Sequence, residues 1–357
     1  MRLTSASFIG GLVLTLALAA CSHQPAPLTE QEKNTLNKLT SNLKTQCVGR
    51  YLIDMPADVS ITGGAKIMGV EFDAKAMSVE EYRRDVANRE AELLTTKHQD
   101  GYKFLLAHGS ARSVNTHYFI HLENTYDENI SRVIEAYKWD GGYRIKLQTG
   151  ANDVTTSAYK DDATMQSIGN NVPQKTWLIF DLLDKVRGRE NDDIPTEPGV
   201  CFKGGFWSAK AQDEEETNTA FSLPAYPDVF FNIDTDTNGH DAITLLQRGG
   251  QIDEYIMSSP GGRTVRKGTV ELQDMQAEEW LLSGTTAAKV IGNYFSLEAN
   301  SRSDHVKEPF VNLTMDTGAL YKSMQGQSLV KASLTEGEAL ALWDVVSRTV
   351  RPRLNGF

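Results

Sequence analysis

The sequence predicts an α+β protein of two related domains, each a mainly antiparallel sheet packed with helices. Short segments of alternating apolar and polar residues, closed by Gly, Pro or Asp, occur throughout the chain and are typical of antiparallel strands. A few longer segments carry capping signals and an apolar stripe, as helices do. The order of these segments after residue 199 repeats the order before residue 190, which favours two copies of one structural unit.

The first twenty residues have the layout of a secretory signal peptide. Arg2 is their only charged residue, and an apolar run follows over residues 8–20. This run is shorter than the roughly 20 apolar residues that a membrane-spanning helix needs. It ends in small residues, as a cleaved signal does. We therefore predict a signal peptide over residues 1–20 and export from the cytoplasm.

The end of the signal, Leu18-Ala19-Ala20-Cys21, has the pattern of a lipobox. Small residues suit the peptidase, and the cysteine thiol would receive the lipid, whose several acyl chains give stable anchoring. We predict lipidation of Cys21, a tether over residues 21–28, and a periplasmic position on a membrane. Ser22 in place of Asp favours the outer membrane. The alternative is an ordinary cleaved signal with a chance cysteine.

Composition and the other cysteines set further limits. The chain of 357 residues has a net formal charge of −11, which argues against nucleic-acid binding and limits membrane contact to the lipid anchor. With Cys21 acylated, Cys47 and Cys201 remain, and in an oxidising periplasm they can form one disulfide. Two buried free thiols are the alternative. The chain-entropy model assigns so long a loop about 4–5 kcal/mol at best.

The first domain is predicted over residues 29–190. Ser78 and Glu81 form a capping box that begins a charged helix. Asp140-Gly141-Gly142 between two alternating segments predicts a hairpin turn. The predicted helices span 30–44, 78–98 and 176–187, and the predicted strands span 47–56, 66–72, 102–107, 116–123, 132–139 and 143–148.

A polar segment with two prolines, residues 191–198, is the predicted linker to a second domain over residues 199–357. Thr335 and Glu338 form another capping box before the last helix. That helix and the last helix of the first domain share an aromatic residue, Asp, two aliphatic residues and basic residues at the end, as repeated domains would; chance similarity of two amphipathic helices is the alternative. The predicted strands here span 199–207, 219–222, 228–233, 263–273, 278–283, 294–299 and 310–315, and the helices span 242–247 and 335–351.

No catalytic motif accompanies this framework. The sequence holds no Gly-x-Ser-x-Gly elbow, Walker loop, Gly-x-Gly-x-x-Gly or His-Glu-x-x-His pattern. We therefore expect no enzyme activity, no catalytic residue and no cofactor.

Two patterns have a partial likeness to metal sites. His117 and His121 share one face of a strand, but only Glu123 accompanies them, and a solvated sheet face is the favoured interpretation. Residues 234–239 copy the first half of a calcium EF-hand loop, but Leu245 stands where the bidentate Glu belongs. We expect no metal at either place.

Acidic residues are the weak candidates for partner contact. Asp213, Glu214, Glu215 and Glu216 form a continuous run. Such runs are mostly solvated, but in a binding protein they can meet a basic patch and raise the association rate. Asp234 and Asp236 are further weak candidates for partner contact, because they too could meet a basic patch. The sequence leaves the true contact residues unknown.

Several stretches resemble the Tli4 immunity proteins of type VI secretion, the partners of Tle4-type phospholipase effectors. These stretches are residues 47–56 and 63–67 in the first half and residues 198–201 and 308–316 in the second. The resemblance implies a two-domain periplasmic protein that binds and blocks a secreted phospholipase and so protects the producer and its siblings. It implies no catalysis and no cofactor, and it identifies no individual contact residue.

Two other functions stay open at this point. One is an envelope structural or assembly lipoprotein without a toxin partner, and the other is a lipid-anchored hydrolase whose site is assembled from scattered residues. A neighbouring gene for a lipase with a Gly-x-Ser-x-Gly elbow would favour the immunity protein.

Overall fold

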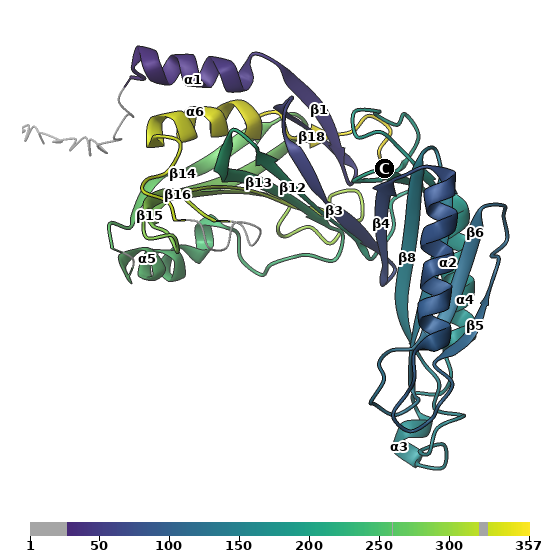
Figure 1. Ribbon diagram of the computed structural model, residues 1–357. Helices are drawn as coiled ribbons and strands as arrows, with labels where there is room; N and C mark the ends of the chain where they lie inside the picture. The colour runs from purple at the N-terminus through teal and green to yellow at the C-terminus, as the bar shows by residue number, and fades with distance from the viewer. Residues whose placement is uncertain (1–26, 259, 321–327) are drawn as a thin grey trace, which may run out of the picture.

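A sheet of twelve antiparallel strands dominates the structure, a computed structural model that describes residues 27–258, 260–320 and 328–357. The strand order is β14-β15-β16-β17-β13-β12-β3-β4-β8-β7-β6-β5. The sheet passes through both halves of a bent molecule, and helices cover parts of both of its faces (Figure 1). Antiparallel sheets packed with helices confirm the predicted fold class.

The first half of the chain contains a helix, two hairpins, a second helix, a four-stranded meander, two further helices and a short strand. Its elements are α1 (Glu30–Thr40), β1 (Leu43–Val48), β2 (Tyr51–Pro56), β3 (Ser60–Ile67), β4 (Val70–Ala76), α2 (Val79–Thr95), β5 (Leu105–Gly109), β6 (Thr116–Leu122), β7 (Ser131–Asp140), β8 (Tyr143–Asn152), α3 (Ala163–Gln166), α4 (Val172–Lys185) and β9 (Val186–Gly188).

The second half repeats this order, apart from α1 and α3. Its elements are β10 (Gly199–Phe202), β11 (Gly205–Ser208), β12 (Glu215–Leu223), β13 (Tyr226–Asp236), the 3₁₀ turn η1 (Leu246–Arg248), α5 (Gly249–Ser258), β14 (Arg263–Leu272), β15 (Met275–Thr285), β16 (Ile291–Ala299), β17 (Phe310–Thr317), α6 (Glu336–Ser347) and β18 (Arg351–Pro352).

The two halves meet where β3 pairs with β12 in the middle of the large sheet. Gly63 lies opposite Thr219 in this ladder and has a φ of +133°. A Cβ atom there would stand 2.1 Å from the carbonyl oxygen of Asn218. Only glycine fits so close an approach of two backbones, so this residue is required for the continuity of the sheet.

The first hairpin of each half belongs to the hydrophobic core of the other half. β1 and β2 form a small sheet with β18, and Ile53 and Met55 pack among the apolar residues of β13, β16, β17 and α6. β10 and β11 form the matching sheet with β9, and Phe202 and Trp207 pack under α4. Each core therefore contains residues from both predicted domains. The two hairpins that pack in the core of the opposite half, β1–β2 and β10–β11, are called the exchanged hairpins below.

The two faces of the large sheet differ. One face is covered by α4 and α6, and the opposite face, on which α2 and α5 lie, is called the polar face below. α4 and α6 pack on the face that carries the two main cores. α2 packs on the opposite face at the outer end of the first half, over Phe119 and Tyr137. Gly249, at the start of α5, faces the ring of Trp280 on that same opposite face of the second half.

Local signals predicted the caps and one turn correctly. Ser78 and Thr335 form the capping boxes that begin α2 and α6. The Gly141-Gly142 turn joins β7 and β8. The helix predicted over residues 242–247 is instead the 3₁₀ turn η1 followed by α5.

Three predicted strands are wrong, because residues 47–56, 66–72 and 199–207 each fold as a hairpin. Their turns need a left-handed backbone. Met68 and Gly69 both have positive φ, of 53° and 74°. A methionine at such a position gives no sequence signal, unlike the Asn-Gly or Asp-Gly pairs that mark most two-residue hairpin turns.

The predicted signal peptide and the predicted lipidation site, Cys21, lie outside the described residues. Among the residues that the structure describes, no helix has both the length and the apolar character to cross a membrane.

Candidate functional site

The polar face of the large sheet is the strongest candidate for a functional surface. Cross-strand pairs place Glu71 beside Lys66, Lys66 beside Glu216, and Glu216 beside Asp236, so side chains from four strands of both halves share this face. Twelve strands at about 4.8 Å spacing give it a length of roughly 50 Å. α2 bounds one end and α5 the other.

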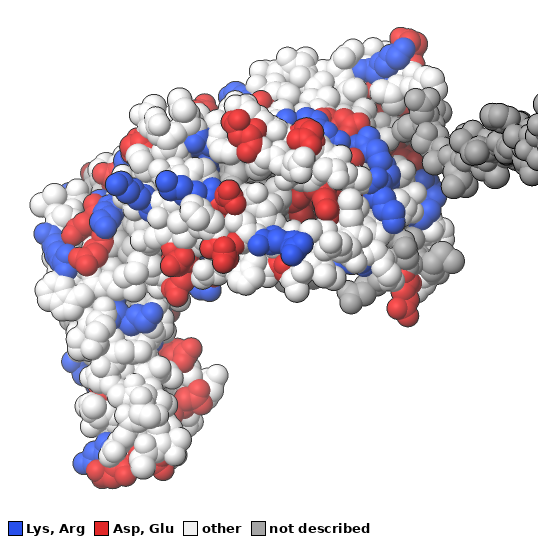
Figure 2. All heavy atoms as spheres, turned by 180° about the vertical axis from the view of Figure 1, so that it is seen from behind, with Lys and Arg blue, Asp and Glu red and all other residues white. Residues whose placement is uncertain are grey.

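The molecule is bent, and in the second half this face lies on the inner side of the bend (Figure 1). α1 and α6 lie on the outer side of the second half, so the polar face of that half looks into the angle between the two arms (Figure 1). Seen from behind, the arms again enclose an open space, and acidic and basic side chains are interspersed along the molecule (Figure 2). The shape suits a convex partner.

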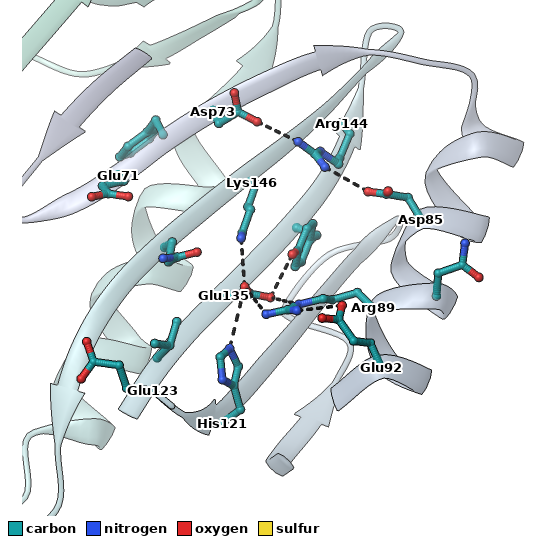
Figure 3. A pocket seen from close by; sticks show the side chains of 15 residues that line it. Glu71, Asp73, Asp85, Arg89, Glu92, His121, Glu123, Glu135, Arg144 and Lys146 are labelled. Atoms are coloured by element: carbon teal, nitrogen blue, oxygen red, sulfur yellow. Dashed lines mark hydrogen bonds and ion pairs between the residues drawn. The ribbon is translucent and has the colours of Figure 1, made fainter. Parts of the chain in front are cut away.

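In the first half, the polar face contains an open cavity of about 840 Å³ between α2 and the sheet, centred on Glu135 (Figure 3). Arg89 of α2 holds this buried carboxylate with two hydrogen bonds of 3.0 and 3.1 Å. Lys146 Nζ and the Tyr137 hydroxyl each donate a hydrogen bond of 2.9 Å. His121 Nε2 lies 3.8 Å away.

These contacts compensate the charge of Glu135 from within the protein. Burial alone would raise the pKa of the Glu135 carboxyl, but the contacts from His121, Arg89 and Lys146 outweigh burial and lower it. On the neighbouring strands, Arg144 donates to Asp73 at 2.7 Å and to Asp85 of α2 at 3.0 Å. Each buried charge therefore already has a partner inside the protein.

The second half of the polar face has the opposite character. Asp234 accepts hydrogen bonds from the amides of Asn218 and Asn232, at 2.5 and 2.6 Å, but the described residues give it no cationic partner. Burial raises its pKa. Burial also raises the pKa of Asp316 to about 6. Tyr294 lies opposite Asp316 on β16.

This region, Asp234, Glu298, Asp316 and Tyr294, is called the acidic patch below. Burial, followed by the charges of the three carboxylates, raises the pKa of the half-exposed Tyr294 hydroxyl. Glu298 pairs with Arg248, yet its pKa is still raised by burial. Carboxylates that are short of positive charge gain most from a cation supplied by a partner.

Of the six acidic residues that the sequence predicts as candidates for partner contact, three lie on the polar face, two lie in an exposed turn and one is buried. Glu216, Asp234 and Asp236 lie on the polar face. Asp213 and Glu214 are exposed in the turn before β12.

Glu215 is the exception, because it is buried and points to the other side of the sheet. Its two oxygens accept hydrogen bonds of 2.7 and 2.8 Å from Arg50, which lies in the turn of the exchanged β1–β2 hairpin. Its inclusion among the partner-contact candidates was therefore wrong, since its role is internal.

Sequence reasoning named Asp234 of the acidic patch and, as half of a disfavoured metal pair, His121 of the cavity, but it missed Glu135, Asp316 and Tyr294. Glu135, Asp316 and Tyr294 lie on separate strands and form no local motif. The alternation of each strand predicts only that these side chains share a face with polar neighbours.

A disulfide joins Cys47 to Cys201, with their Cα atoms 5.7 Å apart. It links the two exchanged hairpins at the point where the backbones of Gly49 and Cys201 also exchange two hydrogen bonds of 2.8 Å. The bond therefore lies at the junction of the halves and away from the polar face.

Two halves with the same order of elements, hairpins packed in each other's cores and one long polar face define a two-unit α+β protein with a continuous polar surface. The chain belongs to the family of Tle cognate immunity protein 4. The model of the N-terminal domain of this family matches residues 44–189, and the model of its C-terminal domain matches residues 193–355.

Solved structures share this fold. The apo structure of the immunity protein TplEi of the type VI secretion system from Pseudomonas aeruginosa is 20% identical, with a TM-score of 0.68 over 88% of this chain and 98% of that one. A chain of the Tle4-Tli4 complex is 20% identical, with a TM-score of 0.67 over 88% of this chain and 99% of that one. No curated protein matches the sequence.

Proposed function

We propose that this protein is a lipid-anchored periplasmic immunity protein that binds and inhibits a phospholipase effector delivered by type VI secretion. Membership in the family over both halves of the chain carries this proposal. A solved relative of the same fold is described as part of a Tle4-Tli4 complex, which supports a cognate effector as the partner.

The polar face is the proposed binding surface. Stable protein–protein interfaces bury about 1,600 Å² in total, or roughly 20–30 residues on each side. A face that runs across twelve strands offers that area without rearrangement. Inhibition by coverage needs no reactive group, which agrees with a sequence that lacks catalytic motifs.

The acidic patch gives the proposed partner a chemical character. Asp234 and Asp316 are partly desolvated, and no described basic residue pairs with them. A lysine or arginine of the effector would restore their favourable ionised state. The effector surface that enters the angle should therefore be basic, and the association rate should fall as salt is raised.

Protection from lysis tests this function. The cognate Tle4-type phospholipase of the producing cell is expressed in the periplasm together with the wild-type protein or with the double variant Asp234→Lys, Asp316→Lys. We expect the wild type to prevent lysis and the double variant to lose protection, because the reversed charges repel a basic partner. The matched control reverses Glu30 and Asp181, which are exposed on α1 and α4, and should protect fully.

Two results would count against the proposal. Continued lysis in the presence of abundant, folded and exported wild-type protein would exclude immunity to that lipase. Full protection by the double variant, with its fold verified by circular dichroism, would exclude the acidic patch as a contact region.

Lipidation at Cys21 is a separate part of the proposal, supported by the lipobox pattern. Cells fed an alkyne fatty acid should label the wild-type protein but not Cys21→Ala. The variant should also move from the membrane fraction to the soluble periplasm. Equal labelling of both proteins would exclude lipid at this cysteine.

A further inference from the structure

Three metal-ligating side chains from three elements meet at the outer edge of the first half. Glu90 lies on α2, His108 on β5 and His117 on β6. One ligand atom of each lies within 4.8 Å of the other two. His108 Nδ1 is 2.7 Å from Glu90 Oε1, and the two imidazole rings have their centroids 6.5 Å apart.

The contacts within the described part of the protein leave a buried nitrogen of one of these groups, His117, without a hydrogen bond. His117 Nε2 is buried from solvent and has no hydrogen-bond partner among the described residues. A buried polar nitrogen normally has a partner, because its desolvation is otherwise uncompensated. The His117 ring packs against Phe119, whose ring centroid is 4.8 Å away, and one of its two nitrogens lies within 4.8 Å of the ligand atoms of the other two groups.

We propose that Glu90, His108 and His117 form a binding site for a divalent transition-metal ion, with Zn²⁺ as the principal occupant. Two imidazoles and one carboxylate are a familiar ligand set for zinc, and a water molecule completes the tetrahedron on the exposed side of His108. Imidazole nitrogen disfavours Ca²⁺ and Mg²⁺, which prefer oxygen ligands. The present spacing needs only small side-chain rotations to reach ligand distances.

This site differs from the one that the sequence brought to attention. The spacing of His117 and His121 pointed to a pair on one strand, but His121 lies against Glu135 instead. The actual neighbours of His117 come from elsewhere in the chain, so the i, i+4 pattern contained one of the three ligands. The proposal replaces the expectation that no metal binds here.

Metal binding would fasten α2 to the edge of the sheet. Glu90 follows Arg89, which holds Glu135 in the cavity. An ion bound by Glu90, His108 and His117 therefore ties the helix that borders the polar face to β5 and β6. Because the ion binds only the folded arrangement, it should also stabilise this half against unfolding.

The test uses the full-length protein purified with a histidine-free affinity tag. Calorimetric titration with Zn²⁺ should give one site per chain, and Co²⁺ should give the visible absorption of a four-coordinate ion. Glu90→Gln, His108→Gln and His117→Gln should each weaken binding at least about tenfold, since even loss of an outer-shell partner costs 10- to 100-fold. His240→Gln, at an exposed histidine of the second half, is the matched control and should bind as the wild type does.

Hydrogen exchange and melting give independent measurements. Zn²⁺ should raise the melting temperature of the wild type and slow amide exchange in residues 79–95, and His108→Gln should abolish both effects. His108 is exposed, so this variant should fold normally without metal. Absence of a zinc site in the wild type would overturn the proposal. Unchanged binding in His108→Gln and Glu90→Gln would overturn it as well.

Discussion

Glu215 provides a direct test of how the two halves are held together. The acidic run around it suggests a solvated surface, whereas the structure buries its side chain to 4% exposure against an Arg50 side chain that is 2% exposed. Removal of one partner of a buried pair leaves an uncompensated charge and costs about 3–5 kcal/mol. Glu215→Ala should therefore lower the free energy of unfolding by that amount.

Arg50 would lose its ionic partner in this variant but would keep its other contacts. Its guanidinium also donates to the carbonyl oxygens of Ala209 and Gly356, so it joins the β1–β2 turn, the second half and the C-terminus. Those two bonds keep the cation in the interior after Glu215 is removed. The buried charge then stays poorly compensated, which supports the upper part of the expected range.

The neighbouring acid is the control. Glu216 pairs with Lys66 at 3.1 Å, but both side chains are about half exposed, and such pairs contribute about 0–1 kcal/mol. Urea denaturation of Glu215→Ala and Glu216→Ala under oxidising conditions measures both costs. If the two variants differ by less than 1 kcal/mol, the interior role of Glu215 is refuted.

Two further predictions concern the junction and the acidic patch. The double variant Cys47→Ser, Cys201→Ser should lose about 2–5 kcal/mol of unfolding free energy, because the disulfide closes a long loop. Urea denaturation should give the same loss for the wild-type protein after its disulfide is reduced. If reduction leaves the unfolding free energy of the wild type unchanged, the prediction is contradicted. The pKa of Asp316 is raised to about 6, so the folded state keeps a proton that the unfolded state releases near pH 4, and stability falls as pH rises between these values. Asp316→Asn should therefore be more stable than the wild type by about 1–3 kcal/mol at pH 7 and should match it near pH 4. If the difference in unfolding free energy between the two proteins is constant across this pH range, the raised pKa of Asp316 is contradicted.

The sequence predicts the features whose causes are local. The capping boxes at Ser78 and Thr335 need only residues three apart, and the hairpin at Gly141-Gly142 needs only its own turn. The turn at Met68-Gly69 was missed because positive φ at a methionine is imposed by the strands around it. The exchange of hairpins depends on pairing between residues more than one hundred positions apart, which no local pattern encodes.

The burial of Glu215 was recoverable from the sequence. Alternate residues of a strand share a face, and counting back in twos from the apolar Phe221 passes Thr219 and Thr217 and reaches Glu215. The period of the strand therefore placed this carboxylate inside, against the impression given by the acidic run. The identity of Arg50 as its partner could not be predicted, since it lies on the exchanged hairpin.

The angle between the arms is fixed by several independent links, and this bears on how the polar face would work. The β3–β12 ladder joins the halves through the main sheet, and each hairpin is buried in the opposite core. The predicted linker is held as well, because Arg353 donates to the carbonyl oxygens of Pro195, Glu197 and Gly199. A binding face that is already formed loses less conformational entropy on association. For the inhibitor proposed above, a polar face held in place by these links would lose little conformational entropy when it binds the effector.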